Sequence, residues 1–332
     1  MQKTTSDPIS PIEQTVRQSV SQAQLRQWMQ FRPQVVAFDL VKNWGGILLA
    51  FAVAAHFPHP FVYAACFVWI SLRQYALFIM GHDGMHFCLN SDHAVNDRIS
   101  RWLIYGPLFM ALEDGRKNHL EHHKTLGTAV DPDRYLHIMG NKNGRFEFLL
   151  FLSGLATFGK TVLKVTPLGH VLSSIKAPND EKSRRRSLSG FIIQRIPVLI
   201  THPIIFSIFV LIGVPWYLYP LLWVAPIYFV FVGDEIRAFC DHAVPRVPDE
   251  EADAQRLVSF VPGAVEAAFF SPHNMCYHAE HHIWPGVPYY NRPLVHDAIK
   301  DRPEITVRRS YLHFLVSVYR SLPLRGRAET SA

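Results

Sequence analysis

The chain has 332 residues, of which 49% are hydrophobic and 18% are charged, and its formal net charge is +6 at pH 7. Soluble proteins carry about 25% charged residues, so the composition argues against an ordinary soluble enzyme and indicates a few membrane spans with a sizeable polar part. The four cysteines include no CxxC pair, which argues against a disulfide framework and a zinc knuckle.

The chain begins with a polar segment and continues with a predicted helical hairpin. Residues 1–35 are rich in Gln, Ser and Thr and lack the basic-then-apolar pattern of a secretory signal. A spanning helix needs about 20 mostly apolar residues, and two such stretches follow, at 41–57 and 61–80, separated by Pro58-His59-Pro60. We expect a polar tail on the cytosolic side and then two antiparallel spans.

A second hairpin is predicted further along the chain, at 191–213 and 216–232. Two other apolar stretches are ambiguous. Residues 99–112 are too short to span and indicate an interfacial or re-entrant segment, whereas 146–165 are long enough but carry Lys160 and Lys164. The basic stretch 176–186 is expected in the cytosol, and 146–165 is therefore predicted to lie flat on the membrane.

The predicted fold is an all-α integral membrane protein, with four transmembrane helices in two hairpins and a cytosolic helical cap. Both termini are expected on the cytosolic side. The predicted organisation is a polar N-terminal tail (1–35), a membrane domain (36–300) and an amphipathic or polar C-terminal tail (301–332).

Histidines form the most specific pattern in the chain. Eight of the 18 lie in three tight groups, which are His82 and His86; His119, His122 and His123; and His278, His281 and His282. Positions i, i+3 and i+4 share one face of a helix, so each group can present its imidazoles to a common point. With four spans, all three groups fall on the same face of the membrane, in the predicted cap.

This pattern predicts a metal centre. Imidazole suits zinc, copper, iron and nickel, so the ligand type does not choose the metal. Eight histidines exceed what one tetrahedral zinc can use, and two ions sharing the set is the simplest interpretation. The chain contains no HExxH motif, which argues against a zinc protease.

The HxxxH, HxxHH and HxxHH boxes, with apolar hairpins between them, resemble the membrane fatty acid desaturase superfamily over roughly residues 40–300. Supporting features are Gly127-Thr128, the Asp131-Pro132-Asp133 run, and the stretch from Tyr277 to Tyr290. The superfamily includes acyl-lipid and acyl-CoA desaturases, hydroxylases and carotenoid ketolases. The resemblance implies two iron ions, O2 as co-substrate, a lipid or other hydrophobic substrate, and electrons from a separate ferredoxin- or cytochrome-type carrier.

The resemblance also implies one further ligand, His242, which lies just after the fourth predicted span. The predicted metal ligands are therefore His82, His86, His119, His122, His123, His242, His278, His281 and His282, with no catalytic residue separate from them. Additional ligands, or carboxylates that orient the histidines, are sought among His273, Asp83, Glu121, Asp131, Asp241 and Glu280. The other histidines are expected not to bind metal: His56, His59, His93, His137, His170, His202, His296 and His313.

Several functions remain in competition at this stage. A fatty-acyl desaturase leads, and a hydroxylase or ketolase acting on a carotenoid, an alkane or another amphiphile is the alternative within the same superfamily. A metal-binding membrane transporter or sensor is the alternative from a different class. Nucleic-acid binding is not expected, because the basic residues adjoin apolar spans. Basic residues either dock an acidic carrier or simply retain a loop in the cytosol; they are Lys182–Arg186, Arg308, Arg309, Arg325 and Arg327.

Overall fold

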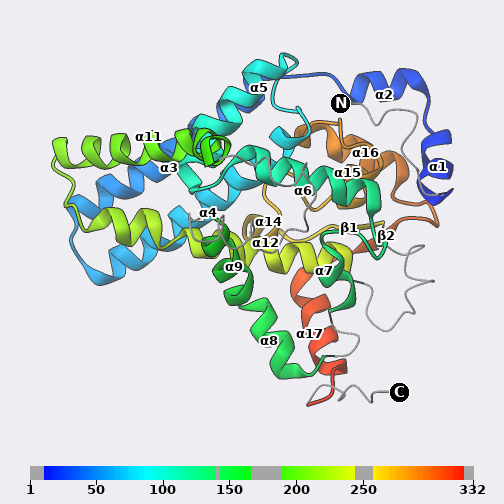
Figure 1. Cartoon of the computed structure of the whole chain (residues 1–332). Coiled ribbons are helices and arrows are strands. Elements are labelled where there is room, and N and C mark those ends of the chain that lie inside the picture. The colour runs from blue at the N-terminus through cyan, green and yellow to red at the C-terminus, as the bar shows by residue number, and fades with distance from the viewer. Residues whose placement is uncertain (1–10, 140–142, 166–187, 244–256, 325–332) are drawn as a thin grey trace.

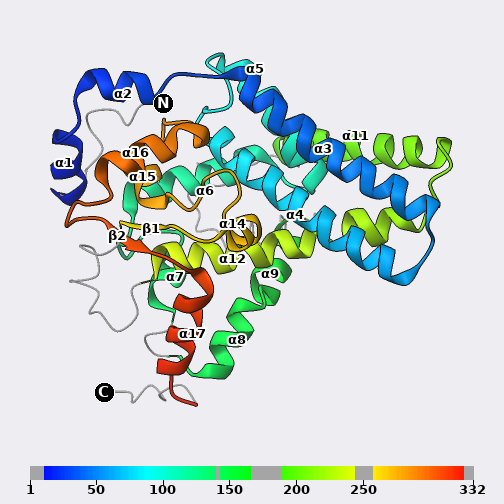
Figure 2. The same ribbon diagram turned by 180° about the vertical axis from the view of Figure 1, so that it is seen from behind.

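The computed structural model describes residues 11–139, 143–165, 188–243 and 257–324. Helices dominate these ranges, and Figures 1 and 2 show long helices projecting together from a body of shorter elements. Both halves of the chain contribute elements to the body.

Among the described residues, three helices are long and apolar enough to cross a membrane: α3 (Pro33–His56), α4 (Pro60–Met85) and α11 (Leu188–Leu211). A helix of 24 residues, the length of α3, extends about 36 Å, and a bilayer core is ~30 Å thick. The helices α3 and α4 pack closely side by side and form the first predicted hairpin. Pro60 opens α4, where its missing N–H costs no hydrogen bond.

The fourth predicted span, 216–232, is not one straight helix. It contains the π-helical turn η4 (Pro220–Val224), and α12 (Ile227–His242) begins only after Pro226. Proline removes a helix hydrogen bond and crowds the preceding turn, which explains the interruption. A bent pair, α8 (Arg145–Leu152) and α9 (Leu155–Val165), supplies the other span-like stretch, with a 48° bend between its helices.

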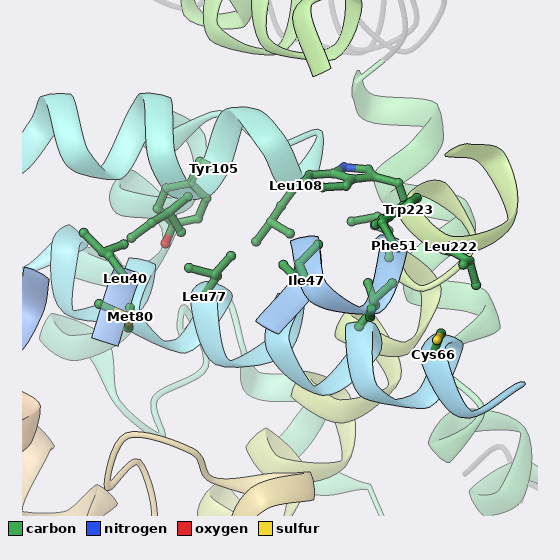
Figure 3. Close-up of a cluster of buried hydrophobic side chains, with 14 of the residues drawn as sticks. Leu40, Ile47, Phe51, Cys66, Leu77, Met80, Tyr105, Leu108, Leu222 and Trp223 are labelled. Carbon is green, nitrogen blue, oxygen red and sulfur yellow. The ribbon is translucent and has the colours of Figure 1, made fainter. Parts of the chain in front are cut away.

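A buried apolar cluster joins the projecting helices (Figure 3). Ile47 and Phe51 of α3 meet Leu77 of α4 and Trp223 of η4 in this cluster. The Trp223 indole donates to the Pro107 carbonyl at 3.0 Å, so the one polar group of this large side chain is satisfied. This packing holds α3, α4 and η4 together. It thereby sets the position in space of the end of α4, which carries His82 and His86.

The short elements of the body surround that end of α4. In chain order they are α5 (His93–Ile99), η1 (Ser100–Tyr105), η2 (Gly106–Leu108), α6 (Leu112–Thr125), α7 (Arg134–Ile138), α14 (Ala264–Phe270), α15 (His278–Ile283), η6 (Tyr289–Asn291) and α16 (Arg292–Ile299). The predicted interfacial segment 99–112 forms η1 and η2, which pack on α4 and α11. The helices α6 and α15 lie beside the end of α4 in both views (Figures 1 and 2).

Both predicted tails are more ordered than the sequence analysis expected. In the N-terminal segment, α1 (Pro11–Gln18) and α2 (Gln22–Trp28) pack against α15 and α16, because Val16 and Trp28 are buried in a shared apolar cluster. In the C-terminal segment, β2 (Thr306–Arg308) pairs in parallel with β1 (Val258–Phe260). The fold is therefore helical with one two-stranded ribbon.

A separate arm consists of α8, α9 and α17 (Tyr311–Ser321). Figure 1 shows these helices running across the direction of the long projecting helices. The arm exposes large apolar side chains, with Phe146 70% exposed; the others on α8 and α9 are Leu149, Leu150, Leu155, Val162 and Leu163. Together α8 and α9 are long and apolar enough to count as one bent span, so the prediction that 146–165 lies flat on the membrane stays a prediction.

Candidate metal centre

The nine predicted ligands come together in the body, from four helices. The end of α4 carries His82 and His86, and α12 ends at His242. The helices α6 and α15 carry three each, at spacings of three and four residues. Contrary to the prediction from the spacing, the imidazoles of α6 and of α15 do not each converge on one point but divide between two clusters.

Five histidines form what we call the first cluster: His82, His86, His119, His123 and His281. Ring nitrogens of four of them all lie within 4.8 Å of one another. His123 joins them because its Nε2 lies 3.1 Å from His119 Nε2 and 3.0 Å from His281 Nε2.

The other four histidines form the second cluster: His122, His242, His278 and His282. Ring nitrogens of His122, His242 and His282 again lie within 4.8 Å of one another. His278 Nε2 lies 3.0 Å from His242 Nε2 and 2.9 Å from His282 Nε2. The rings of His123 and His282 stack at 4.3 Å, so the two clusters are direct neighbours.

The nitrogen atoms fit metal coordination better than a network of hydrogen bonds. Two ligands bound to one ion at ~2.1 Å lie about 3 Å apart when their bonds meet at a right angle, which matches the spacing within both clusters. The Nε2 atoms of His82, His86 and His122 are buried and have no hydrogen-bond partner within the described residues. Buried polar atoms are almost always satisfied, so these three atoms indicate absent ligands, and metal ions suit them.

The electrostatics favour neutral imidazoles, which metal binding requires. Burial, followed by repulsion from neighbouring imidazoles, lowers the pKa of His119 and His123 far below the ordinary value. The same causes lower the pKa of His278 and His281, with nearby arginines adding to the effect. All four are therefore neutral at pH 7 and present lone pairs.

Asp131 is the clearest supporting carboxylate. Its Oδ1 lies 2.8 Å from His122 Nδ1 and its Oδ2 lies 3.1 Å from His137 Nε2, while the backbone N–H groups of Gly127 and Asp133 also donate to it. Burial raises the pKa of Asp131, but the hydrogen bonds from His122 and His137 outweigh it and leave the pKa well below its usual range. An ionised Asp131 holds the His122 proton on Nδ1 and leaves Nε2 free for a metal.

The remaining predicted carboxylates occupy different positions. Asp83 pairs with the buried Arg292, whose guanidinium lies 3.1 Å from His281 Nδ1. Asp241 Oδ2 lies 3.7 Å from His278 Nδ1 and accepts from Arg237.

Two other predicted positions have different surroundings. Glu280 binds Ser259 of β1 and His296 of α16, which fixes α15 between them. Glu121 is exposed on α6.

The structure places His273 outside both clusters. Its Nε2 lies 3.2 Å from the Asn43 side-chain nitrogen, and its Nδ1 lies 3.6 Å from Asp39. Its backbone φ of 54° is left-handed, which is uncommon for a residue other than glycine. The structure therefore links His273 to α3 rather than to either cluster.

Several supporting residues were not expected from the sequence. His137 contacts Asp131, His296 contacts Glu280 at 2.6 Å, and Arg292 contacts His281. Two of these are histidines that had been set aside as unconnected with metal binding. They are not part of a box, so only their burial in the folded chain reveals them.

Two cavities reach the clusters from different sides. A cavity of about 190 Å³ lies among α4, α6, α9 and α12, and its walls include five predicted ligands: His82, His119, His122, His242 and His278. A second cavity, of about 340 Å³, reaches His86 from beside α1 and α2, with Arg17 and Trp284 in its walls. The smaller cavity alone faces both clusters and is the natural place for a reacting group.

Comparison with known proteins gives two matches. A sequence profile of the fatty acid desaturase family matches residues 58–313. Among curated proteins, an sn-1 acyl-lipid omega-3 desaturase (ferredoxin) from Nostoc sp. (strain 36) is 22% identical over 275 residues, which cover 76% of this chain and 71% of that protein. The region that the family profile matches includes every histidine in the two clusters.

Proposed function

Because this chain belongs to the fatty acid desaturase family, we propose that it is an O2-dependent desaturase that introduces a C=C bond into the hydrocarbon chain of a lipid. Family membership makes the chain an oxidoreductase and sets aside the transporter or sensor alternative. The single observation that carries the finer proposal is the pair of adjacent, buried imidazole clusters at the end of an apolar helix bundle.

The nine histidines are proposed to hold two iron ions, one in each cluster. Iron would supply the power to remove hydrogen from an unactivated methylene, which no acidic or basic side chain can do. The protein contributes neutral ligands, fixed tautomers and exclusion of water. Asp131 orients His122, and the Asp83–Arg292 pair lies against His281. These contacts fix the orientation of the ligating imidazoles and thereby the position at which the iron ions would face the substrate carbon.

The lipid substrate is proposed to reach the clusters through the 190 Å³ cavity. Phe78 and Phe231 lie in its walls beside His82 and His122, so a methylene segment would contact both apolar rings and the metal centre. The cavity borders α9 of the exposed arm, which is where a lipid would leave the membrane. The Nostoc relative is named as an acyl-lipid desaturase, which supports a lipid-linked chain as substrate.

The clusters are proposed to face the cytosol. The basic residues Lys182 and Arg184–Arg186 immediately precede α11 in the sequence, and basic loops remain in the cytosol. The first turns of α11 lie beside the histidine-bearing α6, where Arg195 pairs with Asp114 at 3.0 Å. The start of α11 and the clusters therefore share one side of the membrane.

Electrons are proposed to come from a ferredoxin-type carrier, as the name of the Nostoc relative indicates for that protein. Of the predicted docking residues, Arg309 is exposed, whereas Arg308 is half-buried against Phe314 and the Cys240 carbonyl. Lys182–Arg186, Arg325 and Arg327 lie outside the described residues. If replacing Lys182–Arg186 with neutral residues left carrier-driven turnover unchanged, docking at that segment would be wrong.

Iron content tests the metal assignment. His122→Ala removes a ligand of the second cluster, His281→Ala one of the first, and His313→Ala, on the exposed face of α17, serves as the matched control. We expect each cluster variant to lose iron while the control retains two ions per chain. Retention of two ions in both cluster variants would refute the ligand assignment.

Product analysis tests the reaction. We expect cells that express the chain, but not the His281→Ala variant, to accumulate a lipid with one added double bond. Feeding 18O2 separates desaturation from the hydroxylase or ketolase alternative, because only an oxygenated product retains the label. An 18O-labelled hydroxyl or keto lipid, without an alkene, would overturn the desaturase proposal and leave the family assignment intact.

A further inference from the structure

A buried carboxyl group that the proposed mechanism does not use lies in the wall of the 190 Å³ cavity. Glu235 of α12 is only 5% exposed, and it lines the same cavity as His122 and His242 of the second cluster. Arg237, the buried cation nearby, donates to Asp234 and Asp241 instead. Burying a carboxyl group beside a metal centre costs free energy, so a role in the reaction would account for it.

Glu235 is the buried end of a polar wall that reaches the protein surface. The Thr157 hydroxyl of α9 donates to Glu235 Oε1 at 3.1 Å. Thr157 and Tyr135 line the same cavity as Glu235, and Tyr135 is 41% exposed. The cavity therefore borders solvent at Tyr135 and a buried carboxyl group at Glu235.

The proposed reaction needs protons from solvent. O2, two electrons from the carrier, two protons and the two hydrogens removed from the substrate give one alkene and two molecules of water. A hydroxylase has the same need, because O2, two electrons, two protons and one C–H bond give an alcohol and one water. The protons must cross a cavity whose walls combine apolar side chains and imidazoles with the charged Asp133, Asp234 and Arg237.

We propose that Glu235, supported by Thr157, passes solvent protons to the metal centre across this cavity. Each proton is taken up from water by the Glu235 carboxylate and released into the cavity, and the Thr157 hydroxyl orients the carboxyl group by donating to Oε1. This inference rests on one part of the proposed function, which is that O2 is reduced at the two histidine clusters.

The surroundings of Glu235 suit a group that both holds and releases a proton. Burial raises the pKa of Glu235 to about 7, and the nearby charges of Asp234 and Asp133 add to the rise. The hydrogen bond from Thr157 and the charge of Lys160 oppose it. Proton donors work best when their pKa lies near the operating pH.

Turnover of site variants tests the path. Glu235→Gln retains the shape and the hydrogen bond with Thr157 but cannot relay a proton, and Glu147→Gln, an exposed carboxyl on α8, is the matched control. General acids contribute about 10²–10⁴-fold to rate. We expect Glu235→Gln to lose ~10²-fold or more in turnover, with unchanged iron content and unchanged reduction of the iron by the carrier. Thr157→Val should also be slow and Thr157→Ser close to normal, because serine restores the hydroxyl.

A pH profile and a titration distinguish a proton path from a structural role. In the unmodified chain, we expect turnover to fall as pH rises through about 7, because Glu235 is then ionised, and this limb should vanish in Glu235→Gln. In the metal-free protein, the infrared difference between the unmodified chain and Glu235→Gln should contain a protonated-carboxyl band that titrates near neutral pH. This band is separate from that of the buried Asp241, whose pKa burial also raises to about 7 and which remains in both proteins. Glu235→Gln with the rate and pH profile of Glu147→Gln would overturn the path.

The proposed function and the proton path can fail separately. If the unmodified chain oxidises no lipid, the proposed function is wrong. If the Glu235 carboxyl in the metal-free protein shows no titration near neutral pH, the path is wrong whatever the turnover.

Discussion

Replacing Asp131 with asparagine should weaken metal binding while leaving the shape of the site unchanged. Asp131 accepts from four donors, which are the Nδ1 of His122, the Nε2 of His137, and the backbone N–H groups of Gly127 and Asp133. Asparagine replaces one carboxylate oxygen with an NH2 group that can only donate. At least one backbone N–H must then face another donor, whichever way the amide turns.

The expected magnitude follows from these contacts. Loss of the partner that orients a ligating histidine lowers metal affinity by about 10–100-fold, or about 1.4–2.7 kcal/mol. One unsatisfied buried N–H adds about 1–3 kcal/mol of lost stability. Because ionised Asp131 has a lowered pKa, its contribution is present above the ordinary pKa of aspartate and is lost as pH falls through the lowered value. The effect of Asp131→Asn should therefore be complete at neutral pH.

The assay compares Asp131→Asn with Glu121→Gln, which neutralises an exposed carboxylate one residue before His122. Each protein is dialysed against increasing chelator, and the metal retained is measured together with the thermal unfolding midpoint in detergent. Asp131→Asn should lose metal at ~10–100-fold lower chelator concentration than Glu121→Gln. Equal metal retention in the two variants would refute the role assigned to Asp131.

Three further predictions concern the scaffold around the clusters. Arg292→Met leaves the buried Asp83 without its cation and should destabilise the fold by about 3–5 kcal/mol in denaturant unfolding. Lys300→Met breaks an exposed ion pair at the end of the same helix and should leave the free energy of unfolding unchanged. Equal stability of the two variants would contradict the Arg292–Asp83 pairing. Gly84→Ala would place its Cβ 2.2 Å from Ser100 Oγ and should lower the free energy of unfolding by about 1–3 kcal/mol. Gly45→Ala has open space around its Cβ and should be neutral or stabilising. Similar shifts of the thermal unfolding midpoint in the two variants would disprove the close approach of Gly84 to Ser100. Burial lowers the pKa of four ligating imidazoles, those of His119, His123, His278 and His281. The metal-free fold should therefore be most stable above about pH 6.5 and lose stability as pH falls below it. A thermal unfolding midpoint that stays constant down to about pH 5 would show that these imidazoles are not buried in the neutral form.

The three histidine boxes could be recognised in the sequence because they are local patterns, whereas His242 was added only through the family resemblance. Spacings of three and four residues fix the relative direction of imidazoles on a helix, so His119, His122 and His123 could be assigned before the fold was known. The division of the nine histidines between two clusters was not predictable. Neighbours such as His122 and His123 enter different clusters, because adjacent helix positions point about 100° apart.

The supporting residues were less predictable, since they depend on tertiary packing. Asp131 was a candidate because it follows the second box closely, and it does contact His122. His137 and His296 lie outside the boxes and had no periodic signal. The N-terminal segment was taken for a tail because it is polar overall, yet a few apolar residues such as Val16 and Trp28 are enough to pack it on α15 and α16.

The membrane spans could also be predicted only in part. Hydropathy alone identified α3, α4 and α11, because apolar length is a property of the sequence. It could not foresee the π-helical turn at Pro220–Val224, which Pro220 opens at a position where its missing N–H costs no hydrogen bond. The fourth predicted span is therefore interrupted, and it is not among the described helices that are long and apolar enough to cross a membrane.

The two clusters differ in the hydrogen-bond partners of their histidines, and this difference bears on the Asp131 test. In the second cluster, His122 Nδ1 lies 2.8 Å from the ionised Asp131. In the first cluster, His281 faces the guanidinium of Arg292 at 3.1 Å. Carboxylates raise the basicity of a ligating imidazole, whereas a guanidinium can only donate to it. The second cluster should therefore bind its ion more tightly, and Asp131→Asn should reduce that advantage by weakening one cluster rather than both.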